Sequence, residues 1–144
     1  AESLITLGHT VNLVGVSRGG YPALEAFARY PNLINRVVVY ASPLDMENYD
    51  WTLWAKQHTQ QELEEAIEYF SELDSPMSLA EMGHYNGIAD RILLLYGGRD
   101  KICPPIDHCI PFEGHGADCR IFRFNGHDVS LNRRARSMAI QFLK

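Results

Sequence analysis

Ser17, Asp100 and His127 are the residues of this chain whose types and order could do chemistry together. A serine hydroxyl is a poor nucleophile at neutral pH unless a base removes its proton, and an imidazole is well suited to that task. A carboxylate bonded to the imidazole fixes its tautomer and stabilises its charged form. The three residues could therefore form a triad in which Ser17 attacks an acyl carbon, His127 moves the proton and Asp100 orients His127.

Ser17 lies at the centre of a Gly-x-Ser-x-Gly pentapeptide at 15–19. The apolar run at 11–16 before it predicts a short buried strand, and apolar residues at helical spacing from 21 to 28 predict a helix behind it. With Ser17 as the cap, Pro22 would lie about five residues into this helix, so Pro22 fits the first turn if the helix begins a residue or two later. A serine on such a strand-to-helix turn projects its hydroxyl out of the sheet.

The tight turn also assigns roles to the residues on either side of Ser17. We expect Gly15 and Gly19 to approach so closely that side chains at these positions would collide. The backbone N–H of Arg18 is expected to help stabilise an oxyanion, because the first N–H groups of a helix have no partner within it.

Asp100 and His127 each follow a predicted strand, as Ser17 does, so all three should meet at the edge where the parallel strands end. Asp45 also follows a strand and is an alternative acid, but the glycine pair before Asp100 favours Asp100 because it lets the backbone turn there. His115 is the rival base. It precedes the last predicted strand, whereas His127 follows that strand and opens onto the expected site.

The remaining strands are predicted at 36–41, 91–96 and 120–124, and a closing helix follows with Leu131, Ala135, Met138 and Phe142 on its apolar face. Continuous apolar character in the first two of these strands is typical of a parallel sheet covered on both faces. The order of the elements predicts an α/β fold with a doubly wound, mostly parallel sheet.

Residues 47–90 are predicted to form a helical insert within a single domain that spans 1–144. Thr59 begins a capping box, and Ser75 is the expected cap of a second short helix that starts with a proline. Trp51 and Trp54 precede the capping box. They could dock the insert on the sheet, or they could form a lid over an apolar or aromatic substrate group.

The composition excludes several classes of protein. A chain of 144 residues with 46% hydrophobic content can bury one core, and its net charge of −5 argues against nucleic acid as a partner. No apolar run is long enough to span a membrane. We interpret the three cysteines as reduced thiols, with a Cys109–Cys119 or Cys103–Cys109 disulfide as the alternative.

Neither a metal nor a cofactor is expected. Several metal-capable side chains share one loop, but their spacing matches no compact ligand pattern: Asp107, His108, Cys109, His115, Asp118 and Cys119.

At these motifs the chain resembles the C-terminal half of an α/β hydrolase, and it is most similar to the prolyl oligopeptidase-like and esterase branches. The segment from Gly15 to Tyr21 resembles their nucleophile motif. Ser75-Pro76 resembles a recurring dipeptide before the third strand, and Gly97-Gly-Arg-Asp100 followed by Pro104 resembles their acid loop. The order Ser, Asp, His is that of the superfamily.

The resemblance implies earlier strands and a loop that supplies a second oxyanion N–H. Residues 1–8 look like the end of a helix closing at Gly8, and nothing before residue 10 matches those strands. We therefore expect a partial fold whose first strand is an exposed apolar edge. Activity should then be weak unless a complementing N-terminal segment or a longer protein supplies the missing part.

The sequence thus predicts a serine hydrolase that cleaves a small-molecule ester, a thioester or an amide, including a peptide, through an acyl-enzyme and without a cofactor. Acyl transfer to an alcohol or amine would use the same triad. The competing hypothesis is a non-catalytic partial domain that works by association through its open sheet edge. The sequence does not indicate the compartment.

Overall fold

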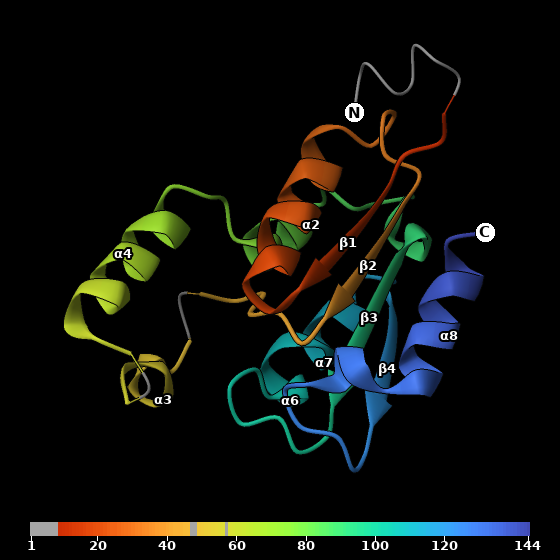
Figure 1. Ribbon diagram of the computed structural model, residues 1–144. Coiled ribbons are helices and arrows are strands. Elements are labelled where there is room, and N and C mark those ends of the chain that lie inside the picture. Colours follow the sequence, from red (N-terminus) through yellow and green to blue (C-terminus); the bar gives the residue numbers. More distant parts are fainter. Residues whose placement is uncertain (1–8, 47–48, 57) are drawn as a thin grey trace.

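The computed structural model describes residues 9–46, 49–56 and 58–144, so the helix end expected at 1–8 lies outside the described residues. Its centre is a sheet of four strands in the order β1-β2-β3-β4, and every neighbouring pair is parallel. The strands are β1 (Asn12–Val16), β2 (Arg36–Tyr40), β3 (Ile92–Gly97) and β4 (Asp118–Phe122) (Figure 1). The parallel sheet confirms the predicted α/β class.

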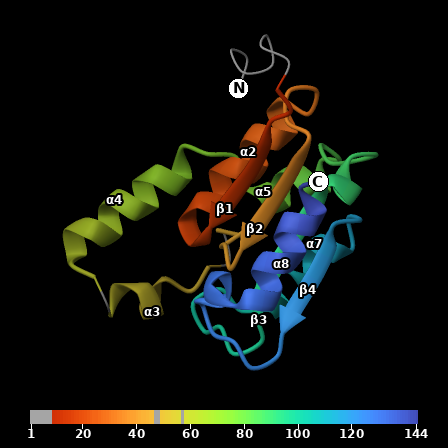
Figure 2. The same cartoon turned by 45° about the vertical axis from the view of Figure 1, so that its right-hand side comes forward.

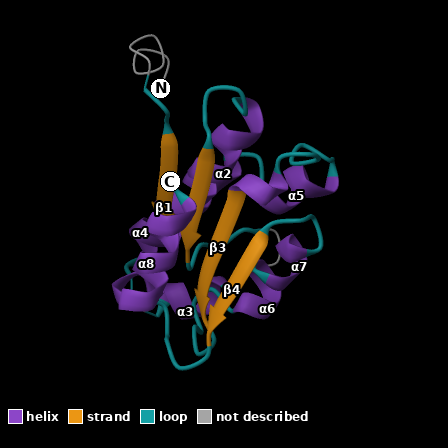
Figure 3. Ribbon diagram, turned by 90° about the vertical axis from the view of Figure 1, so that its right-hand side faces the viewer, coloured by secondary structure: helices purple, strands orange, loops and turns teal. Residues whose placement is uncertain are grey.

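Helices cover both faces of this sheet, as Figures 2 and 3 show. One face carries α2 (Gly20–Arg29), α5 (Pro76–Glu81), α6 (Pro105–His108) and α7 (Ile110–Glu113), and the other carries α8 (Arg133–Phe142). The larger part of the core lies between β1–β3 and the first set of helices. A smaller part lies between β2, β3 and α8. This two-faced arrangement confirms the predicted doubly wound layout.

The two central strands are buried because their side chains on both faces are covered. All six residues of β3 are buried, and Val37, Val38 and Val39 of β2 have no exposed surface. The last strand differs from its prediction by two residues. It ends at Phe122 rather than at 124, because the chain turns there and Asn125 N donates a hydrogen bond to the carbonyl oxygen of Phe122 at 3.0 Å.

The closing helix begins later and buries smaller side chains than the sequence pattern predicted. Leu131 lies in a 3₁₀ turn (Val129–Leu131) before α8 and is 70% exposed. Asn132 caps the helix by accepting hydrogen bonds from two backbone N–H groups. Ala135 and Ala139 are the buried residues of α8, because a helix that lies close to a sheet leaves room for small side chains on the contact line.

In the described part of the segment between β2 and β3 lie the α-helices α3 (Trp51–Ala55), α4 (Gln60–Ser71) and α5, followed by a 3₁₀ turn (Ala89–Arg91). The capping box predicted at Thr59 is present, with Glu62 as its partner. The helix after Ser75 begins at Pro76 as predicted, but the Ser75 hydroxyl makes no cap and donates instead to the carbonyl oxygen of Leu44 at 3.2 Å. Figure 1 shows α4 standing away from the sheet.

The strand before Ser17, β1, is less buried than the sequence predicted. It lies at the end of the strand order, and its only neighbour among the described strands is β2. Val14 and Val16 are 54% and 47% exposed. Their side chains share a face with Val38 and Tyr40, where α8 packs over β2 and β3. Among the described strands, β1 is therefore an edge strand with an uncovered apolar face.

No helix among the described residues is long and apolar enough to cross a lipid bilayer. The three cysteines are free thiols, two of them buried and Cys119 half-buried. A hydrogen bond with Cys119 and, after it, burial raise the pKa of Cys109.

Candidate active site

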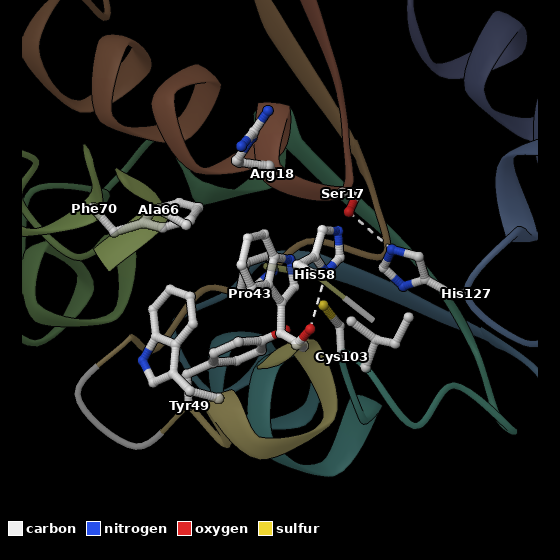
Figure 4. Close-up of a pocket in the computed structure, with 12 residues that line it drawn as sticks. Ser17, Arg18, Pro43, Tyr49, His58, Ala66, Phe70, Cys103 and His127 are labelled. Atoms are coloured by element: carbon white, nitrogen blue, oxygen red, sulfur yellow. Dashed lines mark hydrogen bonds between the residues drawn. The ribbon is translucent and has the colours of Figure 1, made fainter. Parts of the chain in front are cut away.

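Ser17 lies directly after β1, in a 3₁₀ turn (Ser17–Gly19) that leads into α2. Its φ is +50°, a left-handed backbone conformation that costs a non-glycine residue roughly 1–2 kcal/mol. This strained residue lies at the point where the chain turns abruptly from β1 into α2. The turn projects the Ser17 hydroxyl toward His127 (Figure 4). Because α2 begins at Gly20, Pro22 lies in its first turn, as predicted.

The crowding in this turn falls on Gly15 and Gly20, and the expectation for Gly19 was wrong. A Cβ on Gly15 would lie 2.4 Å from Gly20 Cα and 2.6 Å from the carbonyl oxygen of Gly19. A Cβ on Gly20 would lie 2.5 Å from Val39 Cγ1. A Cβ on Gly19 would meet no heavy atom within 4 Å, because that residue faces outward.

The structure brings Ser17, His127 and Asp100 together in one line of hydrogen bonds. Ser17 Oγ lies 2.8 Å from His127 Nε2, and His127 Nδ1 lies 2.9 Å from Asp100 Oδ2. The Asp100 side chain has no exposed surface, whereas the His127 side chain is 28% exposed. The imidazole thus has one nitrogen directed at a buried carboxylate and the other at a hydroxyl that faces the site.

The Asp100 carboxylate is held by backbone groups as well as by His127. Its Oδ1 accepts hydrogen bonds from the N–H groups of Ile102 and Cys103, both at 2.9 Å. These bonds leave Oδ2 for the imidazole. The loop after β3 therefore orients the carboxylate independently of its hydrogen bond with the imidazole.

The loops after β3 and β4 hold each other at this edge of the sheet. Arg99 N donates to the carbonyl oxygen of Asn125 at 2.9 Å. A Cβ on Gly97 would lie 2.1 Å from the carbonyl oxygen of Gly126. Only glycine lets the turn that carries His127 approach the end of β3 so closely.

The rival residues lie elsewhere. His115 precedes β4, at the opposite end of that strand from His127, and its ring is near that of Phe112. Asp45 lies half-buried in the segment after β2, and the carboxylate bonded to His127 is that of Asp100. Among the described residues, no group of three or more His, Cys, Asp or Glu side chains is placed to hold a metal ion.

A cavity of about 240 Å³ opens beside Ser17 and His127. Trp51 and Trp54 both line it, and Trp51 also contacts Phe70 of α4, with 6.1 Å between the ring centroids. The two tryptophans therefore join α3 to α4 and face the cavity at once. Sequence reasoning missed most of the other lining residues, which local patterns do not mark: Pro43, Tyr49, His58, Ala66, Phe70, Ile102 and Cys103.

A wider groove of about 1020 Å³ also reaches Ser17, on the side of β1. Val16 and Gly19 lie along it, and α4 contributes Glu62, Glu65 and Tyr69. The exposed residue Arg18 lines both hollows. Ser17 thus lies where an aromatic cavity and a polar groove meet.

His108 lies buried behind the aromatic cavity. Leu44 N donates a hydrogen bond to His108 Nδ1 at 3.3 Å, and the His108 ring lies 6.0 Å from that of Tyr49. Burial lowers the pKa of His108 from its ordinary value of 6.5, while Asp107, Asp45 and Asp100 oppose that shift. The neutral imidazole therefore anchors the segment that leads from β2 to the cavity.

This burial predicts an acid-sensitive fold. Because the pKa of His108 is lower in the folded chain than in the unfolded chain, the unfolded chain binds more protons below pH 6.5. The free energy of unfolding therefore falls as pH decreases. We expect a loss of up to about 1.4 kcal/mol per pH unit from this group. Urea unfolding at pH 7 and pH 5 should show a smaller loss for His108→Gln than for the parent. The matched control is His84→Gln at an exposed histidine. Equal losses in both variants would contradict the assignment.

No protein-family model matches the chain, and no curated protein sequence matches it. Solved structures do. An α/β hydrolase from the metagenome of lagoon sediments at Mar Chica, Morocco, is 15% identical with a TM-score of 0.62, and the match covers 99% of this chain and 65% of that one. An esterase from Pyrococcus furiosus is 15% identical with a TM-score of 0.64, over 93% of this chain and 52% of that one.

An acylaminoacyl peptidase from Pyrococcus horikoshii is 17% identical with a TM-score of 0.59, over 98% of this chain and 24% of that one. The chain therefore spans about two thirds or less of the length of these three structures. At such low identities the likeness establishes the fold and does not by itself assign an activity.

Proposed function

We propose that this chain, which has the α/β-hydrolase fold, is a serine hydrolase that cleaves an ester, a thioester or an amide through an acyl-enzyme. The observation that carries the proposal is the unbroken line of hydrogen bonds from Ser17 through His127 to Asp100. Nucleophile, base and orienting carboxylate are within hydrogen-bond reach of one another without any movement of the chain.

In the first step Ser17 Oγ attacks the acyl carbon while His127 Nε2 removes its proton. The carbonyl oxygen becomes an oxyanion, for which the backbone N–H of Arg18 is the proposed donor. His127 then gives the proton to the leaving alcohol, thiol or amine as its bond to the acyl carbon breaks. A water molecule repeats the sequence at the acyl-enzyme and releases the acid. If an alcohol or amine replaces the water, the same steps transfer the acyl group.

Asp100 acts on this chemistry through His127. Its buried carboxylate accepts from Nδ1, which leaves Nε2 free to act as a base toward Ser17. The negative charge also stabilises the imidazolium that forms in each step. Because two backbone N–H groups already hold the other carboxylate oxygen, the imidazole is oriented before substrate arrives.

A fluorophosphonate probe tests the proposal, because it reacts with an activated serine whatever the natural substrate is. We expect the purified chain to be labelled at Ser17, and Ser17→Ala and His127→Ala to remain unlabelled. Ser130→Ala is the matched control at a half-buried serine that lines neither hollow, and it should label as the parent does. A folded chain that resists the probe would contradict the proposal.

The exposed valines of β1 favour a second candidate function. Among the described strands β1 has one neighbour, so its outer backbone groups can pair with another strand, and Val14 and Val16 give the partner an apolar face to cover. A chain of this kind would act by self-association or by binding a complementing segment, with no need for turnover. Sedimentation of the same samples separates the candidates, since oligomers that do not label support the second one.

A further inference from the structure

The cavity beside Ser17 has aromatic walls that are already in place. The rings of Tyr49 and Trp51 meet edge to face, with centroids 4.9 Å apart and an interplanar angle of 84°. The rings of Trp51 and Trp54 also meet edge to face, with centroids 6.1 Å apart and an interplanar angle of 84°. Such contacts stabilise ring positions, so these walls need no ligand to form them. A preformed aromatic wall favours binding of a flat apolar group, because little side-chain freedom is lost.

The size of the cavity limits that group. An apolar protein cavity of about 150 Å³ holds one benzene molecule. The cavity here measures about 240 Å³, which leaves room for one benzene ring and the few atoms that join it to the reacting carbon. The second of two rings joined end to end would have to extend beyond the cavity.

The ends of the cavity fix how the group lies. Ser17 and His127 form the reactive end, and Ala66 and Phe70 of α4 form the opposite wall. Ala66 is 2% exposed, so a larger side chain there would grow into the space a ring needs. The cavity is lined by no Asp or Glu side chain from the described part of the chain, whereas Glu62 and Glu65 line the adjoining groove. Arg18 borders both hollows, and its side chain extends away from the aromatic rings (Figure 4).

We infer that the cavity is a subsite for a neutral, single-ring aromatic group, so that the substrates are arylalkyl esters or amides whose polar remainder lies in the groove beside α4. As a statement about substrates, this rests on the proposed function. As a statement about binding, it can be tested without turnover.

The tryptophans supply a direct readout. The chain has two tryptophans, and both line the cavity. Intrinsic tryptophan fluorescence therefore reports on binding at this cavity. Trp54 also borders the groove and Trp51 a hollow beside α4, so cavity variants are needed to locate the binding. In the Ser17→Ala variant, which removes the nucleophile, we expect phenylacetamide to cause a saturable change. 4-Biphenylacetamide should bind at least about tenfold more weakly, because its second ring would have to extend beyond the cavity. Cyclohexylacetamide should bind about threefold more weakly, because it lacks the edge-to-face contacts.

Variants of α4 locate the binding. Added to Ser17→Ala, Ala66→Leu should weaken phenylacetamide at least about tenfold. Glu64→Leu is the matched control, because it puts the same side chain on the exposed side of the same helix, and it should leave binding unchanged. If Ala66→Leu does not fold, Trp54→Ala gives the complementary test. It should enlarge the cavity and admit 4-biphenylacetamide, with Trp51 as the remaining reporter.

The outcomes separate this inference from the proposed function. Equal binding of the three amides, or no effect of either cavity variant, would overturn the subsite even if the chain reacts with fluorophosphonate. Selective binding of phenylacetamide by a chain that resists fluorophosphonate would sustain the subsite and overturn the hydrolase.

Discussion

Replacing Asp100 with asparagine is expected to lower the turnover of a chromogenic ester such as 4-nitrophenyl acetate by about 10⁴-fold, the scale of such a change in a Ser-His-Asp enzyme. The Asp100 carboxylate accepts three hydrogen bonds, two from backbone N–H groups and one from His127 Nδ1. An amide has only one acceptor oxygen. If that oxygen keeps the backbone bonds, the NH₂ group faces Nδ1 and forces the proton of the neutral imidazole onto Nε2, where it can no longer act as a base.

Asp107→Asn is the control for this prediction, since Asp107 is an exposed carboxylate in α6, the helix that follows the Asp100 loop. Its turnover should stay within about twofold of the parent. Circular dichroism should show that both variants are folded before rates are compared. A folded Asp100→Asn variant with near-parental turnover would mean that the carboxylate serves the fold of the loop and not the imidazole.

Replacing Gly15 with alanine is expected to lower the free energy of unfolding by about 3 kcal/mol, at the upper end of the cost of overpacking. The new Cβ would lie 2.4 Å from Gly20 Cα. That neighbour is backbone, so no side chain can rotate away. The turn between β1 and α2 would have to open, and urea denaturation would register the loss as a lower midpoint.

Gly19→Ala is the matched control, because it adds the same methyl group two residues beyond Ser17 without a contact within 4 Å. Its φ of −73° also suits alanine. We expect its stability to remain within about 0.5 kcal/mol of the parent. Equal losses in the two variants would show that the turn tolerates no methyl group anywhere, contrary to the observed geometry.

The sequence predicted the fold class and the three residues that the structure brings together, because both depend on local patterns. Apolar runs mark buried strands, and the residues just after such runs meet at one edge of a parallel sheet. Ser17, Asp100 and His127 each follow such a run. The roles of these residues and the boundaries of the helical insert remain predictions.

The sequence was wrong where a residue's surroundings come from distant parts of the chain. Gly19 looked crowded by its motif, but the crowding falls on Gly20, which Val39 of the neighbouring strand approaches. Val14 looked buried because it is apolar, yet the position of β1 at the end of the strand order leaves it exposed. Neither the approach of Val39 to Gly20 nor the position of β1 in the strand order can be read from the residues next to them in the sequence.

The order of the strands has a consequence for folding. Asp100 and His127 are 27 positions apart and follow adjacent strands, so their pairing requires only that β3 and β4 associate. Ser17 and His127 are 110 positions apart, and β1 reaches the others only through β2. Long loops close late and slowly. We therefore expect Ser17 and His127 to come together only after all four described strands have associated.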